Sequence, residues 1–149
     1  NLEQLGESKH MTLTVFAVGD DGRFVHAGLH ETMLVYRAAE KKVELVEPSG
    51  VWIGLVPDID DMVSDESLQL QPDDVLMLYT DGITEARRES GNGKGNGKGR
   101  KLFGLPRLQE TLQAHGEADV EAINEAVLEA LEGYVRGDDV TLVTLKRQG

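Results

Sequence analysis

The feature that most constrains the fold of this chain is an apolar run that directly adjoins an aspartate. We call such an aspartate and its immediate neighbours an acidic step. The run Val75–Tyr79 reads VLMLY, and Thr80, Asp81 and Gly82 follow it directly. A short apolar run bounded by turn-forming residues predicts a β-strand in the protein core. An aspartate at the end of such a strand has its Cα held by the sheet while its carboxylate projects beyond the core, and a following glycine lets a ligand or the chain come close. The position suits a metal ligand.

A second acidic step has the opposite order, because Asp138 and Asp139 precede the apolar run 140–145. If the two runs are antiparallel neighbours, the end of one strand lies beside the start of the other, and the carboxylates of Asp81 and Asp138 converge. Mg²⁺ and Mn²⁺ prefer oxygen ligands and keep several waters, so two or three carboxylates are an adequate protein contribution. Solvated turns remain the alternative for both steps, since Asp-Gly is a common turn pair.

The first half of the chain has the pattern of an antiparallel meander. Residues 12–18 alternate apolar and small polar side chains, and the GDDG turn at 19–22 leads into 23–29, which predicts a β-hairpin. Further short strands are expected before the run at 75–79, and an acidic loop at 57–66 interrupts them. These strands are expected at 32–36, 43–46 and 68–70, with another apolar run at 51–56.

The last third of the chain changes to helical spacing. One helix is expected before Gly116, with Pro106 in its first turn. Asp119 is a suitable N-cap for a second helix that ends near Gly133 or Gly137. Its apolar positions are Val120, Ile123, Val127, Leu131 and Tyr134. Strands followed by helices predict an α+β fold, with an antiparallel sheet or sandwich that carries helices on its outside.

Composition narrows the classes of function. A chain of 149 residues with 40% hydrophobic content is long enough for one domain. The absence of cysteine excludes disulfides, zinc-thiolate sites and thiol nucleophiles, so hydrolytic chemistry would need oxygen or nitrogen groups or a metal. No apolar run approaches the roughly 18 residues of a membrane span, and the first ten residues have neither the basic flank nor the apolar core of a signal sequence, so we expect a cytoplasmic protein in which this segment does not contact a membrane. Asn1 is not methionine, and we expect a fragment of a longer chain.

The net charge of -12 is unevenly distributed. Residues 87–101 hold six of the 15 Lys and Arg but only one of the 27 Asp and Glu. An acidic body with one basic segment does not favour nucleic-acid binding. The Gly/Lys-rich segment 89–101 lacks the GKS or GKT of a phosphate-binding loop and is predicted to be a mobile loop. It either helps to attract an acidic or phosphorylated partner or is an inert insertion.

Several motifs together resemble one known family. The stretches LQPDDVLMLYTDGITEAR, LFGLPRL and GDDVTLVTL occur in the order found in the C-terminal part of the SpoIIE-type (RsbU-like) branch of the PPM metal-dependent serine/threonine phosphatases. The resemblance covers nearly the whole chain. It implies a β-sandwich flanked by helices, in which a binuclear Mn²⁺ or Mg²⁺ centre activates a water for hydrolysis of phosphoserine or phosphothreonine. Asp81 and Asp138 would then be metal ligands and catalytic residues. Asp138, rather than Asp139, is the expected ligand of its pair, and Thr80 and Glu85 would pack and shape the loop.

The chain also departs from this family's pattern. The resemblance implies further aspartates on upstream strands, and nothing here matches them, so we expect residues 1–149 to be a single partial domain, nearly inactive alone, that lacks the N-terminal portion. The turn GLHET also differs from the Gly-His-x-Pro form of many relatives. His30 is therefore either a proton-transfer group or a loop histidine with a hydrogen-bond partner.

Two function classes remain after these observations. The first is a bacterial signalling phosphatase, for which the resemblance implies a phosphorylated anti-sigma-factor antagonist or a similar STAS-type protein as substrate. The second is a degenerate, non-catalytic phosphatase-like module that binds a partner or senses a signal. A calcium-holding structural domain would need a regular loop of ligands, which the sequence lacks. Exposed sheet edges would permit a homodimer.

Overall fold

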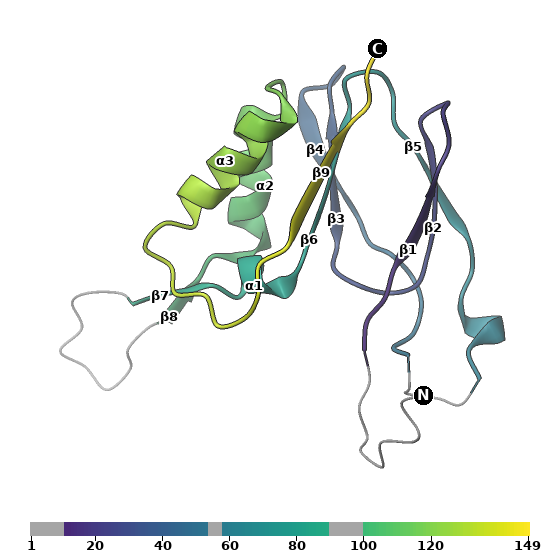
Figure 1. The fold of residues 1–149 in the computed structure, drawn as a ribbon, viewed down its shortest axis with the longest axis horizontal. Coiled ribbons are helices and arrows are strands. Elements are labelled where there is room, and N and C mark those ends of the chain that lie inside the picture. Colours follow the sequence, from purple (N-terminus) through teal and green to yellow (C-terminus); the bar gives the residue numbers. More distant parts are fainter. Residues whose placement is uncertain (1–10, 54–57, 90–99) are drawn as a thin grey trace.

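The computed structural model describes residues 11–53, 58–89 and 100–149. Figure 1 shows three layers: a small sheet, a larger sheet and a layer of helices on the outer face of the larger sheet. The predicted α+β sandwich is confirmed, with the two long helices on one side of it. In the described ranges, no helix is long and apolar enough to cross a membrane.

The smaller sheet has three strands in the order β1-β2-β5. Strands β1 (Val15–Val18) and β2 (Arg23–Ala27) form the predicted hairpin, and β5 (Glu66–Gln69) pairs antiparallel with β2. Gly22 has a φ of 81° at the hairpin turn, a conformation that glycine adopts without a steric penalty.

The larger sheet has four strands in the order β4-β3-β6-β9, all antiparallel. They are β3 (Met33–Arg37), β4 (Lys42–Val46), β6 (Val75–Tyr79) and β9 (Leu142–Lys146). The predicted meander is wrong, because β5 pairs with β2 in the other sheet and β6 returns to β3. The most apolar strands, β3 and β6, take central places in the sheet that is covered on both faces.

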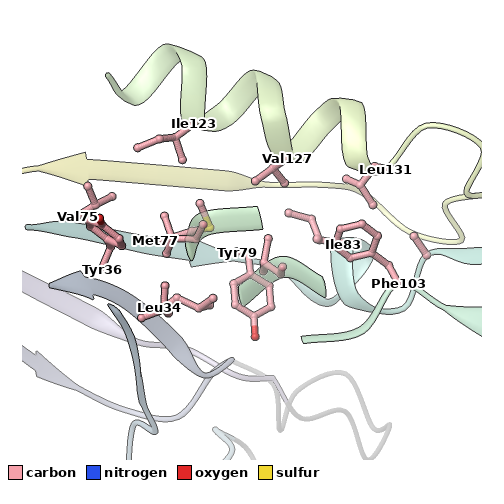
Figure 2. Close-up of a cluster of buried hydrophobic side chains, with 14 residues drawn as sticks. Leu34, Tyr36, Val75, Met77, Tyr79, Ile83, Phe103, Ile123, Val127 and Leu131 are labelled. Atoms are coloured by element: carbon pink, nitrogen blue, oxygen red, sulfur yellow. The ribbon is translucent and has the colours of Figure 1, made fainter. Parts of the chain in front are cut away.

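Successive side chains of β3 and β6 point into two different cores, because strand side chains alternate between faces. One core lies between the larger sheet and the helices and contains Leu34, Tyr36, Val75, Met77 and Tyr79 (Figure 2). The other lies between the two sheets and contains Met33, Val35 and Leu76 together with Phe24, Leu68 and Leu70. A strand that is buried on both faces must be apolar at every position, which explains the run VLMLY.

Helices α2 (Gly104–His115) and α3 (Val120–Ala130) cover the outer face of the larger sheet (Figure 1). Asp119 caps α3 as predicted, and its carboxylate accepts a hydrogen bond of 2.8 Å from the Ala122 amide. Helix α3 ends before Leu131, and Tyr134 lies beyond Gly133, whose φ is 78°. The helical spacing of the sequence therefore continues past the end of the helix.

Three short elements near the end of β6 were not predicted. They are the one-turn helix α1 (Asp81–Thr84) and the paired strands β7 (Arg87–Glu89) and β8 (Arg100–Leu102). Both ends of the segment 89–101, which we expected to be a loop, lie in these strands, and residues 90–99 lie outside the described residues. A 3-10 helix, Asp60–Met62, lies in the predicted acidic loop 57–66. Residues 54–57, which span the end of the apolar run 51–56 and the start of that loop, also lie outside the described residues.

Candidate metal centre

Strands β6 and β9 bring the two acidic steps together. They are antiparallel neighbours, with Tyr79 at the end of β6 opposite Leu142 at the start of β9. The pairing on which we based the convergence of Asp81 and Asp138 is therefore present. Asp81 opens α1 directly after β6, while Asp138 lies in the segment that leads into β9.

Thr80 links the end of β6 to the segment before β9 through three hydrogen bonds. Its backbone amide donates to the Thr141 carbonyl at 3.1 Å. Its hydroxyl accepts a hydrogen bond from the Thr141 amide at 2.9 Å and donates to the Asp139 carbonyl at 3.1 Å. A side chain that satisfies backbone groups in this way fixes the path of the chain on both sides of the site. The loop-shaping role expected for Thr80 thus has a physical basis.

Gly82 allows the two segments to approach closely. A Cβ atom at this position would lie 2.2 Å from the Asp139 carbonyl oxygen and 3.2 Å from that of Asp138. Gly82 is buried in α1 and does not need a positive φ. The glycine after Asp81 is thus required by backbone contact across the site.

Asp81 and Asp138 line one cavity of about 200 Å³, together with Gly82, Glu85, Arg87 and Gly137. Glu85 follows α1 as its C-cap residue, four positions after Asp81. Residues four apart on a helical turn lie on the same face, which places Asp81 and Glu85 on one side of the cavity. Three acidic residues therefore surround the same space, and two of them are the predicted pair.

The donor set fits one hydrated divalent cation. Asp81 and Asp138 are exposed, so a cation could bind them and keep most of its waters. One carboxylate oxygen of Asp138 accepts a hydrogen bond of 2.8 Å from the Asp139 amide, which restricts the orientation of that side chain. Asp139 itself does not line the cavity. Within the described ranges, no group of three or more His, Cys, Asp or Glu residues is close enough to hold a metal, so these residues alone do not form a binuclear site.

Two residues of this cavity, Glu85 and Arg87, were not predicted from the sequence to be site residues. Glu85 was assigned a packing role, although its spacing from Asp81 indicates the same helical face. Arg87 was counted with the basic segment, because nothing in the sequence shows that β7 begins at the cavity. That position depends on long-range pairing, since the backbone of Arg87 forms two hydrogen bonds with Val135, of 2.9 and 2.7 Å.

His30 lies outside the acidic cavity. Its Nδ1 is 2.8 Å from the Thr12 hydroxyl, a hydrogen bond that favours the loop-histidine interpretation. It lines a different cavity, of about 170 Å³, which is mostly apolar and also includes Thr80 and Thr141.

Solved structures share the fold described above. The structure of the RsbU and RsbW domains of Rv1364c from Mycobacterium tuberculosis matches 98% of this chain, with a TM-score of 0.74 and 22% identity. The match covers 38% of the solved chain. The phosphatase domain of SpoIIE from Bacillus subtilis, presoaked with manganese, matches 93% of this chain, with a TM-score of 0.62 and 19% identity. The match covers 56% of the SpoIIE chain. The fold is thus that of the PPM-type phosphatase domains.

The family follows from the sequence as a whole. The family model described as Stage II sporulation protein E (SpoIIE) matches residues 1–148, and the chain belongs to this family. It is 27% identical to the phosphoserine phosphatase RsbU of Bacillus subtilis over 146 residues, which are 93% of this chain and 40% of RsbU. It is 28% identical to protein IcfG of Synechocystis sp. over 127 residues, which are 83% of this chain and 18% of IcfG. The chain therefore spans less than half the length of these relatives.

Proposed function

We propose that this chain belongs to a metal-dependent protein phosphatase of bacterial signalling that hydrolyses phosphoserine or phosphothreonine. One observation carries the proposal. Asp81 follows the end of β6, Asp138 precedes the start of the paired strand β9, and both line one cavity in a chain of the SpoIIE family. The relative RsbU is named a phosphoserine phosphatase, which supports the same reaction class here.

Asp81 and Asp138 are the proposed metal ligands and catalytic residues, with Glu85 beside them. Mn²⁺ and Mg²⁺ are the proposed ions, since related phosphatase structures include a manganese-presoaked SpoIIE domain and RsbX in complex with magnesium. A bound divalent ion would supply a nucleophile at neutral pH by lowering the pKa of water, and would offset negative charge on the phosphoryl group. A binuclear centre would need further ligands besides these residues.

The protein's own contribution is to hold the acidic residues in place before substrate binds. Thr80 ties the end of β6 to the segment before β9, and Gly82 lets these backbones touch. Preorganised charge of this kind needs no rearrangement during the reaction, and a displaced ligand would lose part of that advantage.

The proposed substrate is a phosphorylated STAS-type protein, such as an anti-sigma-factor antagonist, and the proposed location is the cytoplasm. Support comes from RsbU and from the structure in which RsbU and RsbW domains occur together. A homodimer is proposed through β1 and β9, which are edge strands of the smaller and the larger sheet among the described residues. Edge strands carry unpaired backbone groups that can pair with another chain.

A non-catalytic binding module is the second candidate function. The specific observation in its favour is that the described residues contain no group of three or more metal-ligating side chains. Such a module would keep the sandwich and the cavity without hydrolysing a phosphoester.

The first test measures Mn²⁺ binding by electron paramagnetic resonance titration of the chain and of its Asp81→Asn and Asp138→Asn variants. Each variant should weaken binding at least about 10-fold, or about 1.4 kcal/mol, because an amide oxygen replaces a charged ligand. Asp139→Asn is the matched control, since it removes the same charge one residue outside the cavity, and it should bind Mn²⁺ like the wild type.

Hydrolysis is tested in the full-length protein that carries this sequence, with an aryl phosphate and Mn²⁺. Loss of activity in Asp81→Asn and Asp138→Asn, but not in Asp139→Asn, is the expected result. Full activity in both cavity variants would overturn the assignment. Mn²⁺ binding without any hydrolysis would favour the binding module.

A further inference from the structure

Arg87 is a cationic residue in a cavity that is otherwise lined by acidic residues and glycines. It shares this cavity with Asp81, Glu85 and Asp138. A role as a metal ligand is excluded for a guanidinium group, because it is always protonated and has no acceptor atom. Its presence beside three acidic residues therefore calls for another function.

The backbone of Arg87 is held from two sides. Its amide donates to the Val135 carbonyl at 2.9 Å, and its carbonyl accepts from the Val135 amide at 2.7 Å. On its other side, Arg87 is paired with Leu102 of β8. The preceding residue, Ala86, is fully buried, and its carbonyl accepts a hydrogen bond of 2.8 Å from the Phe103 amide. The exposed side chain thus extends from a fixed point at the cavity.

The guanidinium group of Arg87 is not engaged by the protein around it. Across the described ranges, the Arg87 side chain forms no hydrogen bond or ion pair, although three acidic residues line the same cavity. Two other arginines do have such partners, since Arg37 pairs with Glu44 and Asp74, and Arg147 donates to the Leu70 carbonyl. The N–H donors of Arg87 are therefore available to a ligand.

We propose that Arg87 binds the phosphoryl group of the substrate. The planar guanidinium group matches two oxygens of a phosphate monoester and can donate to both at once. The inference rests on the proposed function, because a divalent ion must first offset the acidic residues. One divalent ion balances two of the three carboxylates, and Arg87 is the lining residue that balances the third. Without it, the loaded site would repel a phosphate dianion.

The neighbouring residue Arg88 provides a matched control. Adjacent residues of a strand point to opposite faces, and the Arg88 guanidinium lies 5.8 Å from the centre of the Tyr134 ring. It carries the same charge on the same strand but does not line the cavity. Comparison of the two arginines separates a specific contact from the general effect of net charge.

The experiment measures binding of inorganic phosphate to the Mn²⁺-loaded chain by paramagnetic broadening of the ³¹P resonance. Arg87→Gln should weaken phosphate binding about 10-fold or more, while its affinity for Mn²⁺ should not fall, because the variant removes a positive charge beside the ion. Arg87→Lys should bind with intermediate affinity, because lysine keeps the charge but not the two-point geometry. Arg88→Gln should bind phosphate like the wild type. In the full-length protein, Arg87→Gln should raise the KM for an aryl phosphate.

Different results would overturn the inference. Wild-type phosphate affinity in Arg87→Gln, equal losses in Arg87→Gln and Arg88→Gln, or no phosphate binding by the loaded wild type would each contradict it. Circular dichroism of each variant verifies that it is folded, and Arg87→Lys supplies a second comparison if Arg87→Gln is not. Failure of the wild type to bind Mn²⁺ would instead contradict the proposed function, so the two failures are distinguishable.

Discussion

Gly82 shows how one residue can determine the geometry of the candidate site. From the sequence, the glycine after Asp81 was expected to ease a turn or an approach of the chain. In the structure it belongs to α1 and touches the backbone of Asp138 and Asp139, so a side chain there would separate the two acidic steps. The reason for glycine is close contact between segments that are far apart in sequence.

Replacement of Gly82 by alanine should therefore disturb both stability and metal binding. The added Cβ would meet the Asp139 carbonyl at 2.2 Å, so the backbone must shift. Overpacking of this kind typically costs about 1–3 kcal/mol. Urea denaturation measures the loss, and Mn²⁺ titration of the folded variant should show weaker binding.

Gly137→Ala is the matched control for stability. A Cβ at Gly137 would have nothing within 4 Å, and Gly137 lies in the same segment as Asp138. It should unfold close to the wild-type urea midpoint. Equal stability of the Gly82 and Gly137 variants would contradict the close-packing account.

At the scale of elements, Asp74 joins the turn before β6 to the end of β3. Its side chain is buried, and it accepts hydrogen bonds from the amides of Ala38 and Gln71, at 2.8 and 3.0 Å. The Arg37 guanidinium donates to the same carboxylate at 3.0 Å. Asp74 is thus a structural acid, and it lies in the same motif, LQPDDVLMLYTDGITEAR, as the candidate ligand Asp81.

Asp74→Asn should destabilise the fold by about 1–3 kcal/mol, because it places an amide among buried donors and leaves the partly buried Arg37 with Glu44 as its remaining charge partner. The control is Asp73→Asn, which removes the same charge at an exposed position. Asp73 has a φ of 67°, a conformation that asparagine tolerates, so this variant should be neutral. Thermal unfolding measures both. A small effect of Asp74→Asn, similar to that of the control, would show that the network contributes little.

The sequence predicted most strands and both long helices because their patterns are local. Apolar runs such as Val75–Tyr79 and the cap at Asp119 are visible within a few residues. The order of strands in the sheets depends on which faces are covered, and the predicted meander failed for that reason. Helix α1 is too short to show a periodicity, and β7 pairs with β8 across a segment that has no strand pattern of its own.

The same distinction applies to the candidate site. Asp81 and Asp138 could be chosen from the sequence because each adjoins an apolar strand and matches a family motif. Arg87 could not, because its position depends on pairing with both Val135 and Leu102. Its role as a phosphate-binding residue therefore becomes a hypothesis only once the structure is known.

At the scale of the whole molecule, the described residues leave one side of the sandwich uncovered. Strands β1 and β9 are both outermost, and Val15, Val18, Val143 and Leu145 are exposed along them. Sheets normally protect such edges by pairing or by cover. The candidate site lies at the start of β9, next to this uncovered side, so whatever covers the edge would also approach the acidic cavity.

Asp81 and Asp138 are proposed to hold one divalent ion between them. A crystal structure of the chain soaked in MnCl₂, with anomalous data at the manganese edge, tests this proposal most directly. A manganese peak is expected in the acidic cavity, at about 2.1 Å from a carboxylate oxygen of each of Asp81 and Asp138. A cavity without manganese under saturating conditions, or a manganese ion that neither aspartate touches, would contradict it.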